Sequence, residues 1–150
     1  GKTHVLHIIR ELLSFEPSST GTDIAQALQY FSNAQKRHCT AFLISDFIGV
    51  EGLEKPLMIA SNRHEVNAIQ IYDRRETELP NVGLVKFHDA ETGQDLWVDT
   101  AVASVREQYA SEWKQNQSRI EQLCTKTGVK RMSVRTDEDY VKALMKLFKS

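Results

Sequence analysis

Residues 39–47, Cys-Thr-Ala-Phe-Leu-Ile-Ser-Asp-Phe, are the stretch of sequence that decides the fold. Residues 39–45 predict a buried strand, because apolar side chains fall on both of its faces. Such a strand is typical of the centre of a parallel sheet that helices cover. The run ends at Asp46, so a carboxylate follows the strand directly. The segment therefore predicts an open α/β sheet, in which polar groups gather at the carboxyl ends of the strands.

The segments on either side supply helices and a second strand. Apolar residues recur every three or four positions over 3–14 and from 24 to about 35, which predicts two helices before the strand. A short helix over 53–62 and a strand over 64–72 follow it. The order strand, helix, strand predicts a βαβ unit, which places the two strands in parallel.

The second half of the chain extends this pattern. Residues 73–80 form a charged connection, and two short apolar runs, 83–88 and 95–99, predict an inserted β-hairpin. A long helix follows and is ended by Gly128. A third sheet strand and a last helix complete the chain, over 130–134 and from about 140. We expect the pairs Thr20 with Asp23 and Thr136 with Asp139 to cap the helices that follow them. Residues 1–150 make one domain.

Composition excludes several classes of protein. The 19 basic residues are scattered and the formal net charge is −1, which argues against a nucleic-acid partner. The apolar runs are a few residues long, so we expect no membrane span in this segment. Cys39 and Cys124 lack the spacing of metal ligands, and we interpret them as reduced structural cysteines of a cytoplasmic protein. The chain starts without Met, almost inside a helix, and we expect it to be an excised piece.

Thr22 and Asp46 are the candidate metal ligands. Thr22 offers a neutral oxygen from the loop before a helix, and Asp46 offers a carboxylate at a strand end. Hard cations such as Mg²⁺ take oxygen ligands of these kinds. The alternative is structural: Thr22 or Thr20 caps the helix, and Asp46 begins a polar turn.

Asp73 and Glu76 are candidate partner-binding residues, because they follow the second strand and face the same end of the sheet. Their alternative is a solvated run of mutually paired charges. The pairs His64 with Glu65 and His4 with His7 lack the geometry or the further ligands that a catalytic or metal site needs.

An ordered series of short motifs carries a family resemblance. The series is Gly21–Ile24, Leu43–Phe47, Arg63–Val66, Arg75-Glu76 with Leu79-Pro80, and Asp89–Gly93 followed by Val98–Thr100. It resembles the bacterial family of unknown function number fifty-eight, which is related to von Willebrand factor A domains. Members are commonly encoded beside MoxR-type AAA+ ATPases. The fold class expected is therefore α/β: a partial, Rossmann-like, mostly parallel sheet flanked by helices, with the hairpin inserted.

The resemblance implies a metal-ion-dependent adhesion site built from three loops. The second loop contributes a Thr, matched by Thr22, and the third an Asp, matched by Asp46. The first loop, Asp-x-Ser-x-Ser, has no match here and by the family pattern would lie upstream of Gly1. The chain then corresponds to the C-terminal portion of the domain. Mg²⁺ is expected in the intact protein and no cofactor in this chain alone.

Three functional hypotheses follow. The first is a non-enzymatic protein-interaction module that works with a MoxR-type ATPase. The second is a metal-dependent hydrolase that uses Asp46 with Asp73 or Glu76. The third is a metal-free structural domain. Because a missing first strand would leave residues 39–45 at an open edge, we also expect self-association through that edge or a rearrangement that covers it.

Overall fold

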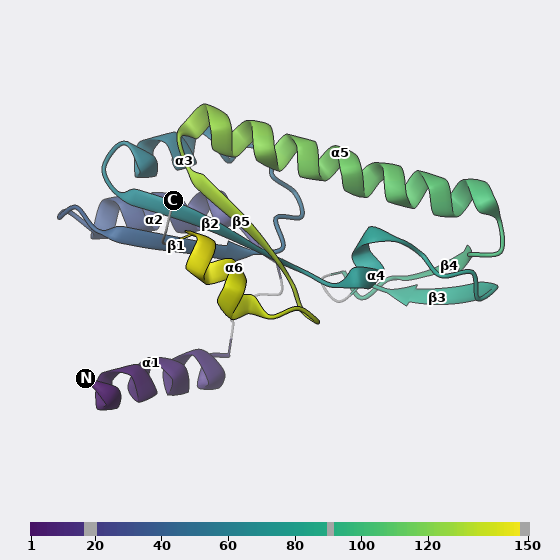
Figure 1. Cartoon of the computed structure of the whole chain (residues 1–150), viewed down its shortest axis with the longest axis horizontal. Coiled ribbons are helices and arrows are strands. Elements are labelled where there is room, and N and C mark those ends of the chain that lie inside the picture. Colours follow the sequence, from purple (N-terminus) through teal and green to yellow (C-terminus); the bar gives the residue numbers. More distant parts are fainter. Residues whose placement is uncertain (17–20, 90–91, 148–150) are drawn as a thin grey trace.

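The computed structural model describes residues 1–16, 21–89 and 92–147, and it confirms the α/β class. Three parallel strands form the main sheet: β1 (Thr40–Ser45), β2 (Glu65–Tyr72) and β5 (Lys130–Arg135). Their order is β1-β2-β5, so the third sheet strand joins the predicted βαβ unit on the side of β2 (Figure 1). The predicted strands agree with the observed ones to within one residue at each end.

The centre of the sheet is β2 and not β1. Five consecutive residues of β2, from Val66 to Gln70, are buried, because strands flank it on both sides and helices cover it. Within the described part of the chain β1 pairs with β2 alone, and its residues alternate between exposed and half-buried. The expectation that residues 39–45 form a central strand is thus wrong for this structure. Their position at an edge of the sheet agrees with the other expectation, that a missing first strand would leave these residues at an open edge.

One face of the sheet carries most of the core. The helices α2 (Ile24–Ala34) and α3 (Glu54–Ser61) lie there with the C-terminal half of α5 (Ala103–Thr127). Their buried side chains include Leu28, Leu57 and Ile120, and they pack against Val66 and Ala68 of β2. The last helix, α6 (Tyr140–Leu147), lies against β5 on the other side of the sheet (Figure 1).

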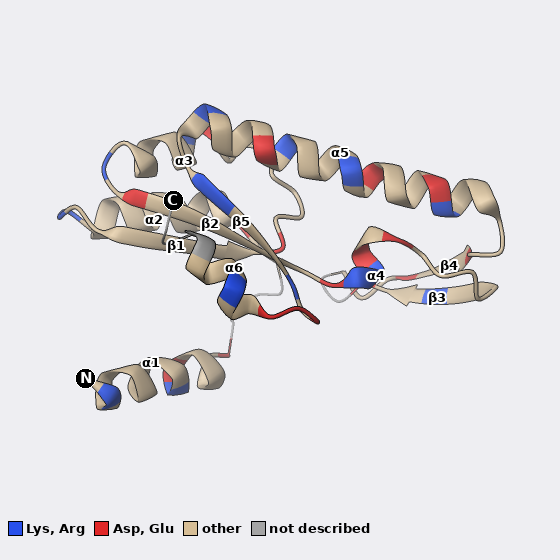
Figure 2. Ribbon diagram, viewed as in Figure 1, with Lys and Arg blue, Asp and Glu red and all other residues tan. Residues whose placement is uncertain are grey.

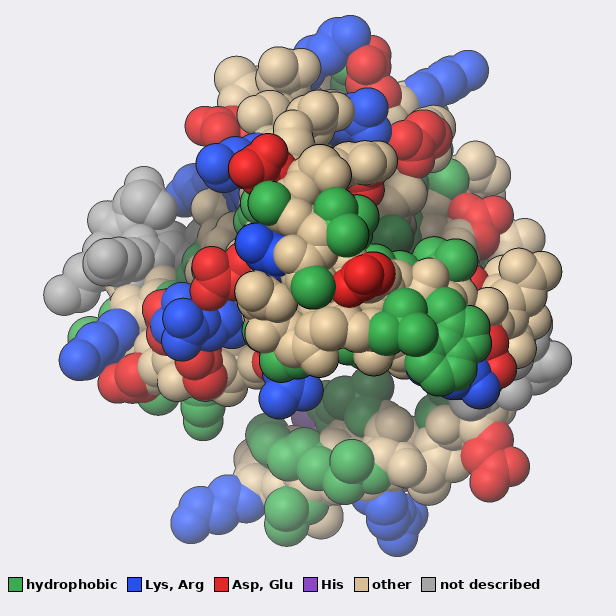
Figure 3. All heavy atoms as spheres, turned by 90° about the vertical axis from the view of Figure 1, so that its right-hand side faces the viewer, with side chains coloured by type: hydrophobic (Ala, Val, Ile, Leu, Met, Phe, Trp, Pro, Cys, Tyr) green, Lys and Arg blue, Asp and Glu red, His purple; other side chains and the backbone are tan. Residues whose placement is uncertain are grey.

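The predicted hairpin is present and lies beyond the sheet. β3 (Leu84–His88) and β4 (Asp95–Asp99) pair in antiparallel fashion beside the N-terminal half of α5. None of the ten residues of these two strands is buried, although the structure describes all of them. Hydrophobic side chains are exposed among charged ones at this end of the molecule (Figure 3). Trp97 of β4 is 61% exposed.

The first helix, α1 (Lys2–Ser14), stands apart from the sheet in Figure 1. Its apolar stripe is the predicted one, yet none of its residues is buried, and all of them are described. Val5, Ile8, Ile9 and Leu12 are each at least 45% exposed.

The sequence predicted the residues that cap the helices less well than it predicted the helices themselves. The cap of α2 is Asp23, whose carboxylate accepts a hydrogen bond from the Gln26 N–H, and not Thr22. Asp139 accepts from the Val141 N–H at the start of α6, while Thr136 bonds elsewhere. Gly128 ends α5 with a φ of +67°, as expected. The expected role of Thr20 in a cap lies outside the described residues, as do residues 90–91 between the hairpin strands and residues 148–150 after α6.

Candidate functional site

One polar residue follows each strand of the sheet directly, and together these residues define the surface that we name the carboxyl edge: Asp46 after β1, Asp73 after β2 and Thr136 after β5. Parallel strands place these positions at one edge. Tyr72 pairs with Arg135, so Asp73 and Thr136 stand level, and the Thr136 hydroxyl donates to the Asp73 carboxylate at 3.0 Å. Ser45 pairs with Gln70, so Asp46 stands two residues short of Asp73.

Asp46 is exposed and is held in a tight turn. Its Oδ1 accepts hydrogen bonds from the Ile48 N–H at 3.1 Å and from the Ser45 hydroxyl at 3.3 Å. The Ser45 hydroxyl oxygen in turn accepts from the Phe47 N–H at 3.0 Å. Both bonds to the carboxylate are made to Oδ1, and together the three bonds restrain an exposed side chain.

The turn is built around a strained residue. Phe47 has a φ of +56°, in the left-handed region that bulky side chains avoid. Its side chain is fully buried, at 0% exposed, so burial of the ring offsets the strain. The Asn116 side chain on α5 also donates to the Phe47 carbonyl at 3.3 Å. Strain of this kind persists only where the surrounding structure determines it, and it is concentrated at functional sites.

A buried network of polar side chains centred on Gln70 holds the backbone of the Asp46 turn. Gln70 on β2 is 0% exposed, and its side-chain N–H donates to the Asp46 carbonyl at 3.2 Å. Its side-chain oxygen accepts from Arg131 at 2.7 Å and from the Ser133 hydroxyl at 3.1 Å, both on β5. Arg131 also donates to Gln117 on α5. The network thus joins three elements to the backbone of the Asp46 turn.

Thr22 is exposed and lies two residues before α2. Phe31, near the end of α2, lies against His64, which directly precedes β2, so α2 runs antiparallel to the strands and starts on the side of their carboxyl ends. The structure therefore places Thr22 on the side of the sheet where Asp46 lies. No metal-binding group of three or more His, Cys, Asp or Glu occurs within 1–16, 21–89 and 92–147.

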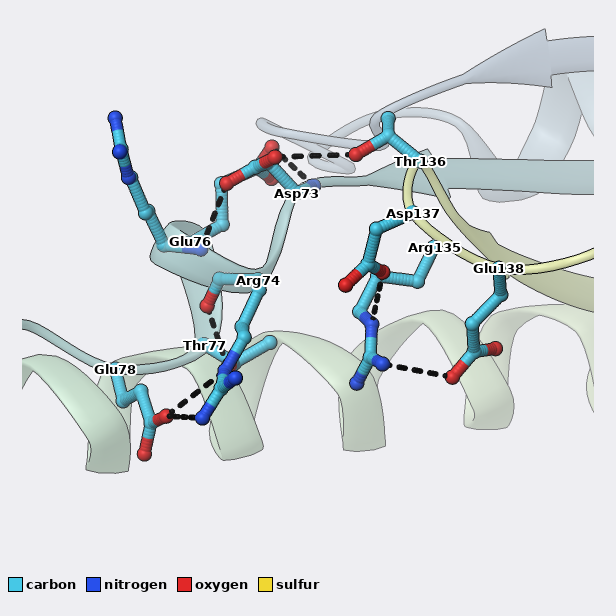
Figure 4. Close-up of polar contacts among 10 residues, drawn as sticks. Asp73, Arg74, Glu76, Thr77, Glu78, Arg135, Thr136, Asp137 and Glu138 are labelled. Carbon is cyan, nitrogen blue, oxygen red and sulfur yellow. Dashed lines mark hydrogen bonds and ion pairs between the residues drawn. The ribbon is translucent and has the colours of Figure 1, made fainter.

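Asp73 and Glu76 form a helix cap that sequence reasoning overlooked (Figure 4). The connection 73–80 contains a short helix, α4 (Arg74–Thr77). The Asp73 carboxylate accepts from the Arg75 N–H at 2.8 Å, and Glu76 accepts from the Asp73 N–H at 2.8 Å. The spacing Asp-x-x-Glu could have revealed this capping box. The hydrogen bond from Arg75 first, and that from Thr136 second, lower the pKa of Asp73.

The end of β5 adds charge to this region. The Arg135 guanidinium pairs with Asp137 and with Glu138, the latter at 3.0 Å (Figure 4). The hydrogen bond to Asp137 raises the pKa of Arg135. Figure 2 shows basic and acidic residues interspersed along the ribbon, including α5. Within those residues, no helix has the length and apolar content to cross a membrane.

The described residues supply an incomplete shell for Mg²⁺. Thr22 and Asp46 contribute one neutral oxygen and one carboxylate, whereas Mg²⁺ takes a near-ideal octahedron of oxygen ligands. Asp73 is committed to α4 and to Thr136, and Glu76 to the cap. Among the described residues, Thr22 and Asp46 would therefore leave most of that octahedron to other oxygens.

Comparison with known proteins agrees with the motif series. The model of a family described as "Protein of unknown function DUF58" matches residues 1–119. The chain belongs to the DUF58 family. This family is number fifty-eight, which the motifs indicated, and the match includes Thr22, Asp46, Asp73 and Glu76.

Relatives of this DUF58 chain occur in mycobacteria. An uncharacterized protein of Mycobacterium avium is 31% identical over 136 residues, which cover 89% of this chain and 79% of the relative. Uncharacterized proteins of Mycobacterium bovis and Mycobacterium tuberculosis are 29% identical over an alignment of 154 residues. This chain is covered completely in those alignments but spans 48% of either relative, about half its length. No solved structure matches the chain.

Proposed function

We propose that this chain is a non-enzymatic protein-interaction module, similar to a von Willebrand A domain, that binds its partner through the carboxyl edge. The observation that carries the proposal is the turn at Phe47. A buried, strained aromatic residue holds the exposed Asp46 carboxylate in one conformation. A preorganised charge loses little conformational entropy when it is bound, which favours recognition of a protein partner.

The partner that we propose is a MoxR-type AAA+ ATPase. The support is the resemblance of the motif series to a family whose members are commonly encoded beside such ATPases, together with the family match. The proposal includes a cytoplasmic location, which the free cysteines Cys39 and Cys124 favour.

We propose that Mg²⁺ binds only when this chain is part of a longer protein. Thr22 and Asp46 would hold the cation in part, and oxygens from outside this chain would complete its shell. We therefore expect calorimetric titration of Mg²⁺ into this chain to show no binding. Specific binding to this chain that Asp46→Asn abolishes would contradict the incomplete shell.

The test is a binding measurement with a MoxR-type ATPase from the same genome. Wild-type chain and Asp46→Asn are titrated into the ATPase, and we expect the substitution to weaken binding by roughly tenfold or more. Glu107→Gln is the matched control, because Glu107 is exposed on α5 and lies outside the carboxyl edge. Equal affinities for the wild type and Asp46→Asn, or no binding by either, would contradict the proposal.

We also propose that β1 pairs with β1 of a second copy. β1 is the outer strand of the described sheet, contains no charged residue, and leaves Ile44 59% exposed. Charged side chains are the common protection of such edges. Sedimentation should show concentration-dependent dimers for the wild type and monomers for Ile44→Lys. Ile48→Lys, at an exposed position beyond the strand, is the control. A wild type that stays monomeric at all concentrations would contradict this proposal.

A further inference from the structure

A cysteine and a histidine meet at the end of the sheet opposite the carboxyl edge. Cys39 directly precedes β1, and His64 directly precedes β2. Because Thr40 pairs with Glu65, Cys39 and His64 stand level across the two strands. Beside this pair the two strands are joined by a hydrogen bond from the Glu65 N–H to the Cys39 carbonyl at 2.9 Å. Their side chains meet with Sγ and Nδ1 at 3.6 Å. The sequence separation of 25 residues hid this pair from motif analysis.

The imidazole of His64 is enclosed. Its residue is 3% exposed, and the ring of Phe31 on α2 lies against it at a centroid distance of 4.8 Å. Nε2 is buried and has no hydrogen-bond partner among the described residues, whereas Nδ1 faces the Cys39 sulfur. The tautomer decides which ring nitrogen carries the proton, and with the proton on Nε2 the nitrogen that faces the sulfur is unprotonated. A neutral imidazole with Nδ1 unprotonated can accept a thiol proton.

We propose that Cys39 is a reactive thiol that hydroperoxides oxidise to a sulfenic acid, with His64 as its proton acceptor. The sulfur attacks the terminal peroxide oxygen, so that an S–O bond forms as the O–O bond breaks. The thiol proton passes to Nδ1 of His64 and then to the leaving oxygen, which departs as water or as an alcohol. The sulfur is oxidised by two electrons and the peroxide is reduced by two, so no further reactant is required.

The second cysteine of the chain provides an internal contrast. Cys124 on α5 is 3% exposed, and burial raises the pKa of its thiol. Cys39 is partly exposed and has the imidazole beside it. Reactivity follows access and loss of the thiol proton, so oxidation should select Cys39 over Cys124.

The experiment treats the folded chain with hydrogen peroxide, traps sulfenic acid with a dimedone-type probe, and measures labelling of each cysteine by mass spectrometry. We expect Cys39 to be labelled at least about tenfold faster than Cys124. His64→Asn should slow labelling of Cys39 by roughly tenfold or more, because an amide accepts the proton poorly. His38→Asn is the matched control, since its ring lies 6.4 Å from that of His64 and His38 is exposed.

Labelling of Cys124 also reports whether each variant is folded, because this thiol becomes accessible on unfolding. If His64→Asn unfolds, the comparison moves to the wild type in buffer and in urea, where Cys39 should react faster in the folded chain. The proposal is overturned if folded His64→Asn labels at the wild-type rate, if unfolding accelerates Cys39, or if no sulfenic acid forms on Cys39.

Discussion

The loops that follow β1 and β2 both begin with an aspartate, and they hold it in different ways. After β1, the backbone is strained at the buried Phe47, and Asp46 is presented to solvent. After β2, Asp73 caps a helix of four residues and bonds to Thr136. The first loop is fixed by contacts from distant elements and the second mainly by its own residues. A charge that is fixed from a distance and remains exposed is the better candidate for binding.

The largest expected effect tests the buried support of the first loop. Phe47→Ala removes a fully buried ring and should lower the free energy of unfolding by about 3–5 kcal/mol, because a cavity adds to the lost transfer energy. Urea titration followed by circular dichroism measures this change. Ile48→Ala, at the neighbouring position that is 69% exposed, should change stability little. Similar effects at the two positions would contradict the account of the turn.

A smaller effect should come from the polar network beneath the turn. Gln70→Leu keeps the volume but leaves the Asp46 carbonyl and Arg131 without this partner, which should cost about 1–3 kcal/mol. The same urea titration applies, with Gln122→Leu on the exposed face of α5 as control. A fully stable Gln70→Leu protein would show that the network is dispensable.

The second loop should show a smaller effect that depends on pH. Hydrogen bonds from Arg75 and Thr136 lower the pKa of Asp73 below its ordinary value of 3.8. A lowered folded-state pKa adds stability above the ordinary value, and this stability is lost as the pH falls through the folded pKa. Asp73→Asn should therefore be less stable than the wild type at pH 7, and the two should converge in acid.

Thermal melts from pH 7 to pH 2 would measure this convergence. Glu107→Gln, which changes an exposed carboxylate on α5, should follow the wild type throughout. A difference between Asp73→Asn and the wild type that grows as the pH falls would contradict the assigned sign.

The smallest effect on stability is expected at Asp46 itself. Asp46→Asn keeps an oxygen that can accept from the Ile48 N–H, so the free energy of unfolding should change by less than about 0.5 kcal/mol. The same variant should lose partner binding, as proposed above. Loss of binding with loss of stability would instead indicate a structural role.

The sequence predicted the strands and most helices because their apolar periodicity is local. The sequence could not show which strand is central in the sheet. β2 is central because it pairs with both β1 and β5, which lie far from it along the chain. Thr136 was assigned to a cap by its spacing, but Asp73 at the neighbouring strand end binds it instead. The helix α4 was missed because its four residues carry no apolar stripe.

The residues of the candidate site likewise fall into two groups: those that the sequence predicted and those that only the structure revealed. Asp46 and Thr22 were found from local motifs, whereas Gln70, Asn116 and the Cys39–His64 pair depend on contacts between elements. The strain at Phe47 has no signature in the sequence, because an aromatic residue after Asp46 continues the apolar pattern. Long-range contacts are what a single sequence leaves undetermined.

The length of α5 has a consequence for access. Its 25 residues form a rod of roughly 37 Å. Trp113 stacks near Tyr72 at the end of β2, and the Tyr109 hydroxyl donates to the Arg75 carbonyl at 3.2 Å. These contacts fasten α5 to the end of β2 and to α4, and the hairpin lies beside α5 beyond the carboxyl ends of the strands (Figure 1). A large partner that docks on the carboxyl edge must therefore fit beside the hairpin as well as match the charge of the edge, so steric fit restricts what can bind.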